Sequence, residues 1–412
     1  MIEKYFRDDR FAERHRAGPL RPHVDGFVAS LETQGYAVST VVHSIRLLGR
    51  LNHWLQRSGL GLVDLDDETT DSFLRSQKRK DGVRRGEAAV LRALLEYLRA
   101  ADVLARPTVR PAASPVDCVT GDFAQYLRHE RGVSVATVAN YRPVARLFLF
   151  ECWDGKPADQ WLFSIRGVQQ FVLRHARDHS PKRTQLMLCS LRAFLRFAHL
   201  RGRTATDLAE HVPKVAGWRL AAVPRWLAAD DVEKTLRHCD QRRKMGRRDY
   251  ALLLLLARLG LRAGEVLTLE LGDIHWEASE IVVRGKGPQR KCFPLSQEVG
   301  RALAAYLRTA RPSCACRRVF IRTRAPCRGL GHPSSVSTIV ARALARADLD
   351  PPCKGAHLFR HSLATAMLRR GVSLSEIGRI LHHKSPDTTA IYAKVDFGSL
   401  RSLAQPWPGD QP

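Results

Sequence analysis

Residues 355–395 constrain the fold more than any other part of this chain, because one short helical pattern there carries several reactive side chains. They are His357, Arg360, His383 and Tyr392. Apolar residues recur between them at helical spacing, and Ser373 followed by Glu376 predicts a capping box that opens a second helix. The segment therefore predicts a small group of helices that brings two imidazoles, a guanidinium and a phenol together.

This set of groups suits chemistry on a phosphodiester. A phenol is a nucleophile once it loses its proton, but its unperturbed pKa of about 10 makes ionisation near neutral pH cost roughly 4 kcal/mol. Neighbouring cations and a base lower that cost, and an arginine fork matches two phosphate oxygens. For any one residue, a buried tyrosine beside ordinary core histidines is the alternative. The ordered set favours the reactive interpretation.

The order of these residues resembles a known family. The run H-x-x-R-H-x-x-A-T, then L-x-H, then a tyrosine nine residues on, is similar to the second signature box of the tyrosine recombinases, or phage integrases. Their first box, G-L-R-x-x-E, has its counterpart in residues 260–265. The sequence departs from the family at His382, where glycine is usual, and at Leu358, where aspartate is frequent. Neither position carries the chemistry.

The resemblance implies a reaction and roles for this set. Tyr392 would attack a DNA phosphate, form a 3′-phosphotyrosine and release a 5′-hydroxyl. Arg262 and Arg360 would clamp the non-bridging oxygens and stabilise the developing charge, with Glu265 orienting them. The covalent link conserves the energy of the phosphodiester, so neither a cofactor nor a metal is expected. The family acts as a homotetramer on two DNA sites.

The remaining catalytic roles also come from the resemblance. The family carries a lysine on a β-hairpin between the two boxes, which corresponds here to Lys286, and this lysine would protonate the leaving 5′-oxygen. His357 is the candidate to accept the tyrosine proton, and His383 to hydrogen-bond the phosphate.

The net charge points to the same kind of partner. The chain has 412 residues with 67 lysines and arginines against 41 acidic residues, a net charge of +26 and a pI near 10.4. A polyanion such as double-stranded DNA is the leading inference. No apolar run is long enough for a membrane span, and the first residues are charged, so we expect a cytoplasmic protein.

The nine cysteines follow no regular framework, which favours free thiols in a reducing compartment. A zinc set is the alternative for four residues with irregular spacing, namely Cys314, Cys316, Cys327 and His332. A loop with free thiols is the better interpretation.

The first half of the chain contains a repeat. Phe27 matches Phe123 at an offset of 96, and residues 91–93 match 191–193, Leu-Arg-Ala in both, at an offset of 100. We infer two tandem copies of one four-helix unit, with chance similarity between amphipathic helices as the alternative. Segments rich in Pro and Ala, 105–115 and 204–225, predict linkers.

These patterns together predict the fold class. The protein should be mainly α with a small antiparallel β-sheet: two tandem helical-bundle units precede an α+β catalytic domain. The expected domains are an N-terminal helical, SAM-like unit at 1–104, a core-binding helical, SAM-like domain at 117–206, and a catalytic domain with a C-terminal tail at 224–412. The tail is apolar and, as in the family, would dock on a neighbouring protomer.

The core-binding domain would grip DNA through basic side chains on its surface. The candidates are Arg142, Arg146, Lys182, Arg183, Arg192 and Arg196. Such contacts with phosphates position a protein on DNA. For any single residue, a solvated helix face is an equally good interpretation.

Two other functions remain open. One is a DNA-binding accessory protein of a multi-recombinase element without turnover, and the complete residue set argues against it. The other is a type IB topoisomerase, which uses similar chemistry as a monomer. The favoured function is a site-specific recombinase that moves phage DNA or a mobile element.

Overall fold

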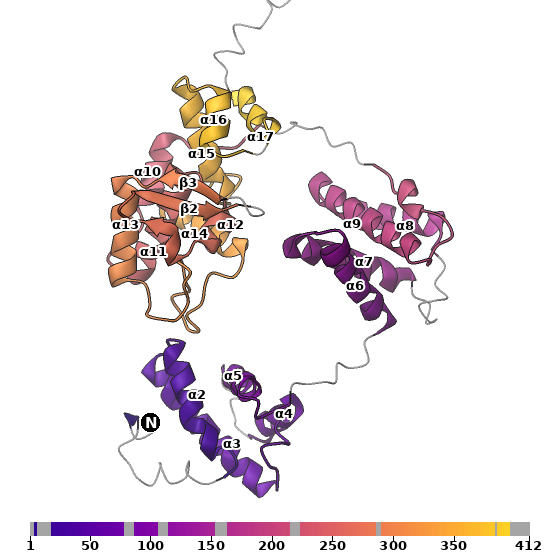
Figure 1. Ribbon diagram of the computed structural model, residues 1–412, viewed down its shortest axis with the longest axis vertical. Helices are drawn as coiled ribbons and strands as arrows, with labels where there is room; N and C mark the ends of the chain where they lie inside the picture. The colour runs from indigo at the N-terminus through magenta and orange to yellow at the C-terminus, as the bar shows by residue number, and fades with distance from the viewer. Residues whose placement is uncertain are drawn as a thin grey trace, which may run out of the picture. The chain divides into compact units, whose positions relative to one another are not determined.

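The computed structural model of the chain contains helices and one small sheet (Figure 1). It describes residues 4–5, 18–77, 86–105, 114–152, 163–214, 223–285, 290–383 and 385–395. Contacts within the chain divide it into two units, one of residues 106–221 and one of residues 1–105 together with 222–412. The two boundaries between these units fall within the two segments that the sequence predicts as linkers.

The N-terminal helices are α2 (Arg21–Thr33), α3 (Val38–Arg57), α4 (Asp67–Ser76) and α5 (Glu87–Ala100). The side chain of Asp66 caps α4 by accepting the amide of Thr69 at 2.7 Å. Apolar faces at helical spacing pack into one core; its most buried members include Phe27, Leu48, Leu51, Phe73, Leu94 and Leu98. The buried carboxylate of Glu87 is paired with Arg50 at 2.7 Å, so its burial leaves no unpaired charge.

The second unit is built from helices as well. They are α6 (Pro115–Gln125), continued by the π-helix η2 (Tyr126–Glu130), then α7 (Val135–Cys152), α8 (Ile165–Ala176) and α9 (Pro181–Leu200), with a 3-10 turn η4 (Leu208–His211) after them. Aromatic rings fill the core, and Phe123 meets Phe194 edge to face at 5.4 Å. Leu91 and Leu191 are both buried. The tandem repeat itself stays a prediction.

The C-terminal helices surround a three-stranded antiparallel sheet (Figure 1). The chain order is α10 (Ala229–Arg237), α11 (Lys244–Arg258), α12 (Ala263–Thr268), η5 (Leu271–Asp273), β1 (Ile274–His275), β2 (Glu280–Arg284), β3 (Arg290–Pro294), α13 (Gln297–Thr309), α14 (Pro333–Arg346), α15 (His357–Arg369), α16 (Leu374–Ile380), α17 (Asp387–Ala390) and the 3-10 helix η6 (Ile391–Val395). The small sheet and the predominance of helix confirm the predicted fold class.

The sheet is ordered β1-β2-β3 and turns one face to the helices. In the register of β2 and β3, Ile281 pairs with Phe293 and Val283 pairs with Lys291. All four side chains are buried, because alternate residues of a strand share a face. Lys291 is therefore an inward-pointing lysine in an otherwise apolar row, which places a charge beside the functional site.

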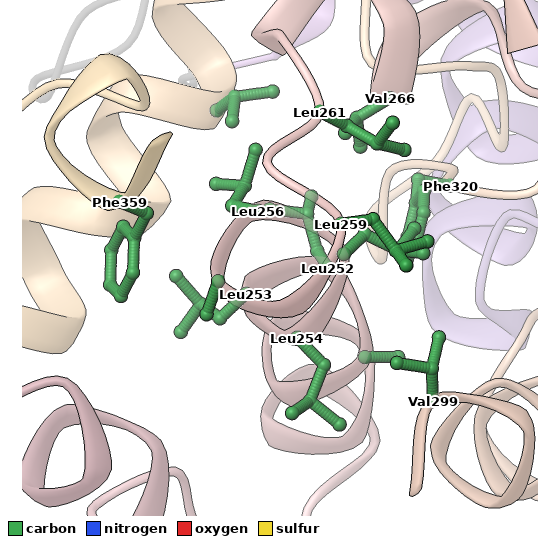
Figure 2. Close-up of a cluster of buried hydrophobic side chains, with 14 of the residues drawn as sticks. Leu252, Leu253, Leu254, Leu256, Leu259, Leu261, Val266, Val299, Phe320 and Phe359 are labelled. Carbon is green, nitrogen blue, oxygen red and sulfur yellow. The ribbon is translucent and has the colours of Figure 1, made fainter. Parts of the chain in front are cut away.

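Helix α11 forms the centre of this part of the chain. Its residues 252–256 are consecutive leucines with no exposed surface. In Figure 2 the labelled Leu252, Leu253, Leu254 and Leu256 point to different sides of the helix. A helix that is apolar around its whole circumference belongs in a core. These leucines accordingly belong to the largest core cluster of the C-terminal part of the chain.

Truncating one of these leucines should be costly. We expect Leu254→Ala to lower the free energy of unfolding by about 2–5 kcal/mol, because the lost contacts leave a cavity that the packed helices cannot close. Thermal unfolding followed by calorimetry measures this effect. Met245→Ala, at an exposed position of the same helix, is the control, and equal melting temperatures for the two variants would contradict the packing.

Candidate active site

Arg262 is presented by a sharp turn at the end of α11. Gly260 has φ +61°, and an added Cβ there would lie 2.7 Å from Leu381, so both the backbone and the space require glycine. Arg262 then begins α12: its amide donates to one oxygen of Glu265 at 2.8 Å and its Nη1 to the other at 3.1 Å. Glu265 is buried, so it holds this guanidinium in one orientation.

Arg360 lies on α15 and is 3% exposed. Its Nη1 donates to the carbonyl of Gly260 at 2.5 Å, and its Nη2 donates to the carbonyl of Leu381 at 2.6 Å. These bonds join the ends of α11 and α16 to α15. Burial lowers the pKa of Arg360 to about 10, and nearby Arg262 acts in the same direction. Two cations held this close form a site for an anion.

Lys291 adds a third cation beside Glu265. Its Nζ lies 3.6 Å from Glu265 Oε1 and donates to the carbonyl of His382 at 3.2 Å. Burial lowers the pKa of Lys291, while Glu265 opposes that shift. The His382 backbone has φ +50°, a left-handed conformation that favours glycine at the end of a helix. The resemblance gives glycine as the usual residue at this position, and glycine adopts this conformation without strain.

Tyr392 lies on η6 and is 1% exposed. Its Oη is 2.9 Å from Nδ1 of His361, and its ring lies nearly parallel to that of His383 with centroids 6.4 Å apart. Burial raises the pKa of Tyr392 to about 12, against the opposing effect of Arg360 and then Arg262. The phenol is therefore protonated at neutral pH in the structure without DNA.

The two histidines beside the phenol are also uncharged at neutral pH. Burial lowers the pKa of His361 to about 4, with His357 and Arg360 contributing. Burial likewise lowers the pKa of His383 to about 4, with Arg360 contributing. Nδ1 of His383 is 2.6 Å from Oγ1 of Thr389, which fixes its ring. The site thus combines neutral proton acceptors with fixed cations.

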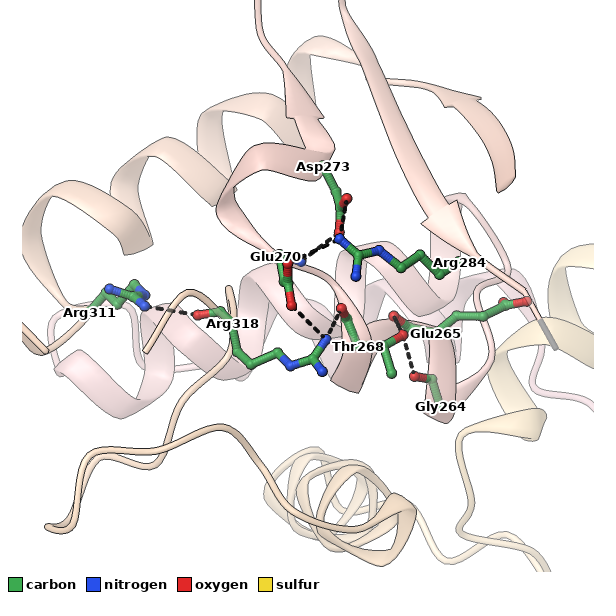
Figure 3. Close-up of polar contacts among 8 residues, drawn as sticks. All are labelled: Gly264, Glu265, Thr268, Glu270, Asp273, Arg284, Arg311 and Arg318. Atoms are coloured by element: carbon green, nitrogen blue, oxygen red, sulfur yellow. Dashed lines mark hydrogen bonds and ion pairs between the residues drawn. The ribbon is translucent and has the colours of Figure 1, made fainter. Parts of the chain in front are cut away.

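A polar network supports the strand that leads into this site. Arg284 ends β2 and pairs with Glu270 at 3.0 Å and with Asp273 at 3.4 Å (Figure 3). Glu270 also pairs with Arg318, which donates to the carbonyl of Thr268. These contacts tie the end of β2 to the segment after α12. The end of β2 at Arg284 is thereby anchored.

The chain resembles proteins of known family along its full length. Residues 225–398 match the phage integrase family. The whole chain is 42% identical over 412 residues to a protein described as an integrase/recombinase in Sinorhizobium fredii strain NBRC 101917 / NGR234, and the alignment covers 99% of both chains. The tyrosine recombinase XerD of Listeria monocytogenes is 28% identical over 293 residues, 68% of this chain and 95% of XerD. The chain belongs to the tyrosine recombinase, or phage integrase, family.

Solved structures of tyrosine recombinases share its fold. The XerH site-specific recombinase bound to palindromic difH substrate matches with a TM-score of 0.54 at 18% identity, over 69% of this chain and 83% of XerH. The lambda integrase dimer bound to a COC′ core site matches with a TM-score of 0.52 at 15% identity, over 81% and 93% of the two chains. The fold of the chain thus agrees with its membership of the tyrosine recombinase family.

The structure brings together four of the residues that the sequence singled out in this recombinase. Arg262, Arg360, His383 and Tyr392 lie in one site. His357 is exposed at the start of α15, with its ring centroid 6.3 Å from that of His361. Lys286, which the resemblance assigns to the leaving group, lies outside the described residues, and so does the tail after Val395.

Two residues of the recombinase site were not singled out from the sequence, His361 and Lys291. His361 directly follows Arg360 in the second signature box, and the helical spacing did not show which histidine faces the tyrosine. Lys291 follows the alternation of β3, which puts it on the same face as Phe293. Both residues lie in patterns that the sequence shows. The role of each follows only from its partner in a distant segment, which is Tyr392 for His361 and Glu265 for Lys291.

The side chains that are predicted to contact DNA differ in their surroundings. Arg146 pairs with Asp117 at 3.1 Å, and Arg192 donates to the carbonyls of Val212 and Pro213 at 3.3 and 2.8 Å, which ties α9 to the segment after η4. Arg142 and Arg196 are exposed.

Four of these basic residues line two hollows of the second unit. Arg192 and Arg196 line a cavity of 290 Å³ together with Arg131. Lys182 and Arg183 line another, of 580 Å³, between α7 and α9. Their contact with DNA stays a prediction.

The cysteines of the recombinase are all free thiols. Among the described residues, no three His, Cys, Asp or Glu side chains come together as a metal site, and this includes the four considered for zinc. Within the same ranges, no helix has the length and the apolar character that crossing a membrane requires.

Proposed function

We propose that this recombinase cleaves and rejoins DNA strands at a specific site through a 3′-phosphotyrosine intermediate. The observation that carries the proposal is the placement of Tyr392 beside the buried Arg360 in one site with Arg262. Tyr392 is the nucleophile. The two guanidiniums bind the non-bridging oxygens and stabilise the charge of the pentacovalent phosphorus.

The supporting roles follow from the surroundings of this core. His383 contributes to an open cavity of 780 Å³ that Arg379 and His382 also line. Arg379 gives this wall its positive charge, because the pKa values of both histidines are lowered, and the neutral ring of His383 donates a hydrogen bond to a phosphate of the DNA backbone. Lys286 protonates the leaving 5′-oxygen, and Glu265 holds the guanidinium of Arg262 in its orientation. The reaction needs no metal and no cofactor.

We also propose the setting of the reaction. The relative that matches over 99% of the chain is described as an integrase/recombinase, which supports the movement of phage DNA or a mobile element. The recombinase acts as a homotetramer on two DNA sites, with the second unit and its basic residues gripping the duplex. The N-terminal unit, a second copy of the same four-helix pattern, adds a further DNA or assembly surface.

The test begins with the DNA site. Duplexes that the purified protein retains from a random pool give a binding sequence, and a nicked duplex with that sequence traps the covalent intermediate because the cut end diffuses away. The expected result is a protein–DNA adduct that survives denaturation, and strand exchange between two intact sites. Binding without an adduct would favour the accessory protein, and relaxation of supercoiled DNA without exchange would favour the topoisomerase.

Binding should weaken steeply as salt rises. Each phosphate that the protein neutralises contributes a slope of about −0.9 to the plot of log binding constant against log salt concentration. Replacing the exposed Arg196 by alanine should therefore make the slope shallower by about 0.9 if this side chain meets a phosphate. Titrations of labelled duplex at several salt concentrations measure both slopes. A binding constant that does not change with salt would contradict the DNA-binding interpretation of the +26 charge.

A further inference from the structure

We propose that His361 is the group that accepts the proton of Tyr392 when the strand is cleaved. This assignment rests on the proposed function and adds a catalytic residue to it. The sequence favoured His357 for the role, by resemblance, whereas the geometry points to the histidine one helical turn later.

The contact between the two side chains is direct. Oη of Tyr392 and Nδ1 of His361 are 2.9 Å apart, and the rings meet edge to face with centroids 5.6 Å apart. Helix α15 supplies the histidine and η6 supplies the tyrosine, and these two elements pack against each other. A general base has to lie within hydrogen-bond reach of the proton that it removes. His361 meets this condition before any DNA is bound.

The other histidines of the site are placed differently. Nδ1 of His383 is engaged by the hydroxyl of Thr389, and its ring lies parallel to the tyrosine ring. In that arrangement the face of the imidazole, and not a nitrogen lone pair, meets the phenol. His357 is exposed to solvent at the first position of α15. His361 is therefore the histidine whose hydrogen bond to the phenol the structure records.

The charges around the pair keep it neutral until DNA binds. The groups that face it from the packed elements are His357 and Arg360 of α15, His383 after α16, and Arg262 at the start of α12. Burial holds the pKa of His361 at about 4 and that of Tyr392 at about 12. At neutral pH both groups are uncharged, and the tautomer of His361 that carries its proton on Nε2 accepts the hydrogen bond of the phenol at Nδ1.

Bound DNA changes this balance. A phosphodiester anion between Arg262 and Arg360 offsets the positive charge that opposes protonation of His361, so the substrate itself makes the histidine more basic. In the cleavage step the bond from Oη to phosphorus forms while the bond from phosphorus to the 5′-oxygen breaks. The phenolic proton passes to Nδ1 of His361, and the 5′-oxygen takes a proton from Lys286. The base is thus active only where a phosphate is in place.

The test compares three variants of the full chain in single-turnover cleavage of the nicked duplex. His361→Ala removes the acceptor. His361→Asn keeps an oxygen that accepts the hydrogen bond of Tyr392 but cannot hold the proton. His357→Asn tests the alternative acceptor on the same helix. DNA binding and melting temperature are measured for each, so a loss of folded protein is recognised and corrected for.

Both His361 variants should cleave about 10²- to 10⁴-fold more slowly at neutral pH. Their rates should rise about tenfold per pH unit, because hydroxide must now remove the proton and the ionised fraction of a phenol below its pKa grows by that factor. The wild type should depend little on pH, and so should His357→Asn whatever its rate, because it keeps the acceptor. A wild-type rate for His361→Asn would overturn the assignment, since hydrogen bonding alone would then suffice. A tenfold rise per pH unit in His357→Asn that is absent from the His361 variants would also overturn it.

A second substrate separates the two proton transfers. A sulfur in place of the bridging 5′-oxygen gives a leaving group that needs no proton, so it should restore cleavage by Lys286→Ala. It should not restore cleavage by His361→Ala. Rescue of the His361 variant would place this residue on the leaving-group side and overturn the proposal. If the wild type itself forms no adduct, the proposed function is wrong. That outcome is read from the wild type alone, so it is distinct from every outcome of the His361 variants.

Discussion

Tyr392→Phe is expected to bind its DNA site with the affinity of the wild type and to form no covalent adduct. Phenylalanine lacks the oxygen that joins phosphorus, so no other property of the site compensates for the change. The ring itself stays in place, because Tyr392 packs in a cluster with Ala364, Ile377 and Leu381. Only the hydrogen bond to His361 is lost, which should lower the free energy of unfolding by about 0.5–1.5 kcal/mol.

Denaturing gels of the protein with the nicked duplex measure this loss. Tyr306→Phe is the matched control: Tyr306 is also fully buried, and its hydroxyl accepts the amide of Ile321 at 3.4 Å. It should lose a similar small amount of stability and cleave like the wild type. An adduct in Tyr392→Phe would show that another residue attacks the phosphate.

Arg360→Lys should lower the cleavage rate about 10²- to 10³-fold although the positive charge is kept. The guanidinium reaches the carbonyls of Gly260 and Leu381 at the same time and still has donors for a phosphate. A lysine ammonium has neither the planar fork nor the reach to do this. A buried carbonyl left without a donor also costs about 1–3 kcal/mol of stability. Binding to the DNA site should change far less than cleavage.

The control for this experiment is Arg248→Lys. Arg248 is buried in α11 and pairs with Asp249 at 2.7 Å, outside the catalytic group. It should be destabilised to a comparable extent and still cleave at the wild-type rate per folded molecule. If both variants cleave at the same rate, the loss in Arg360→Lys comes from unfolding and the role in catalysis is wrong.

Local patterns predicted the elements of this protein well where one stretch of sequence holds the whole signal. Ser373 and Glu376 form the predicted capping box, each side chain accepting a backbone amide of the other. The leucines of 252–256 are buried as their apolar run predicts. Helix α11 begins ahead of this run, at Lys244, and Arg248 and Asp249 are buried in its first half because they pair with each other.

The sequence by itself determined the family, the fold class and the types of residue in the active site. Only the tertiary structure decided which of these residues touch. His357 and His361 lie four apart on one helix and so share a face, and the spacing gives no preference between them. The position at which η6 crosses α15 selects His361. In the same way, strand alternation turns Lys291 inward, but Glu265 comes from a separate helix and makes that burial possible. Such pairings depend on packing between segments distant in sequence, which no local pattern encodes.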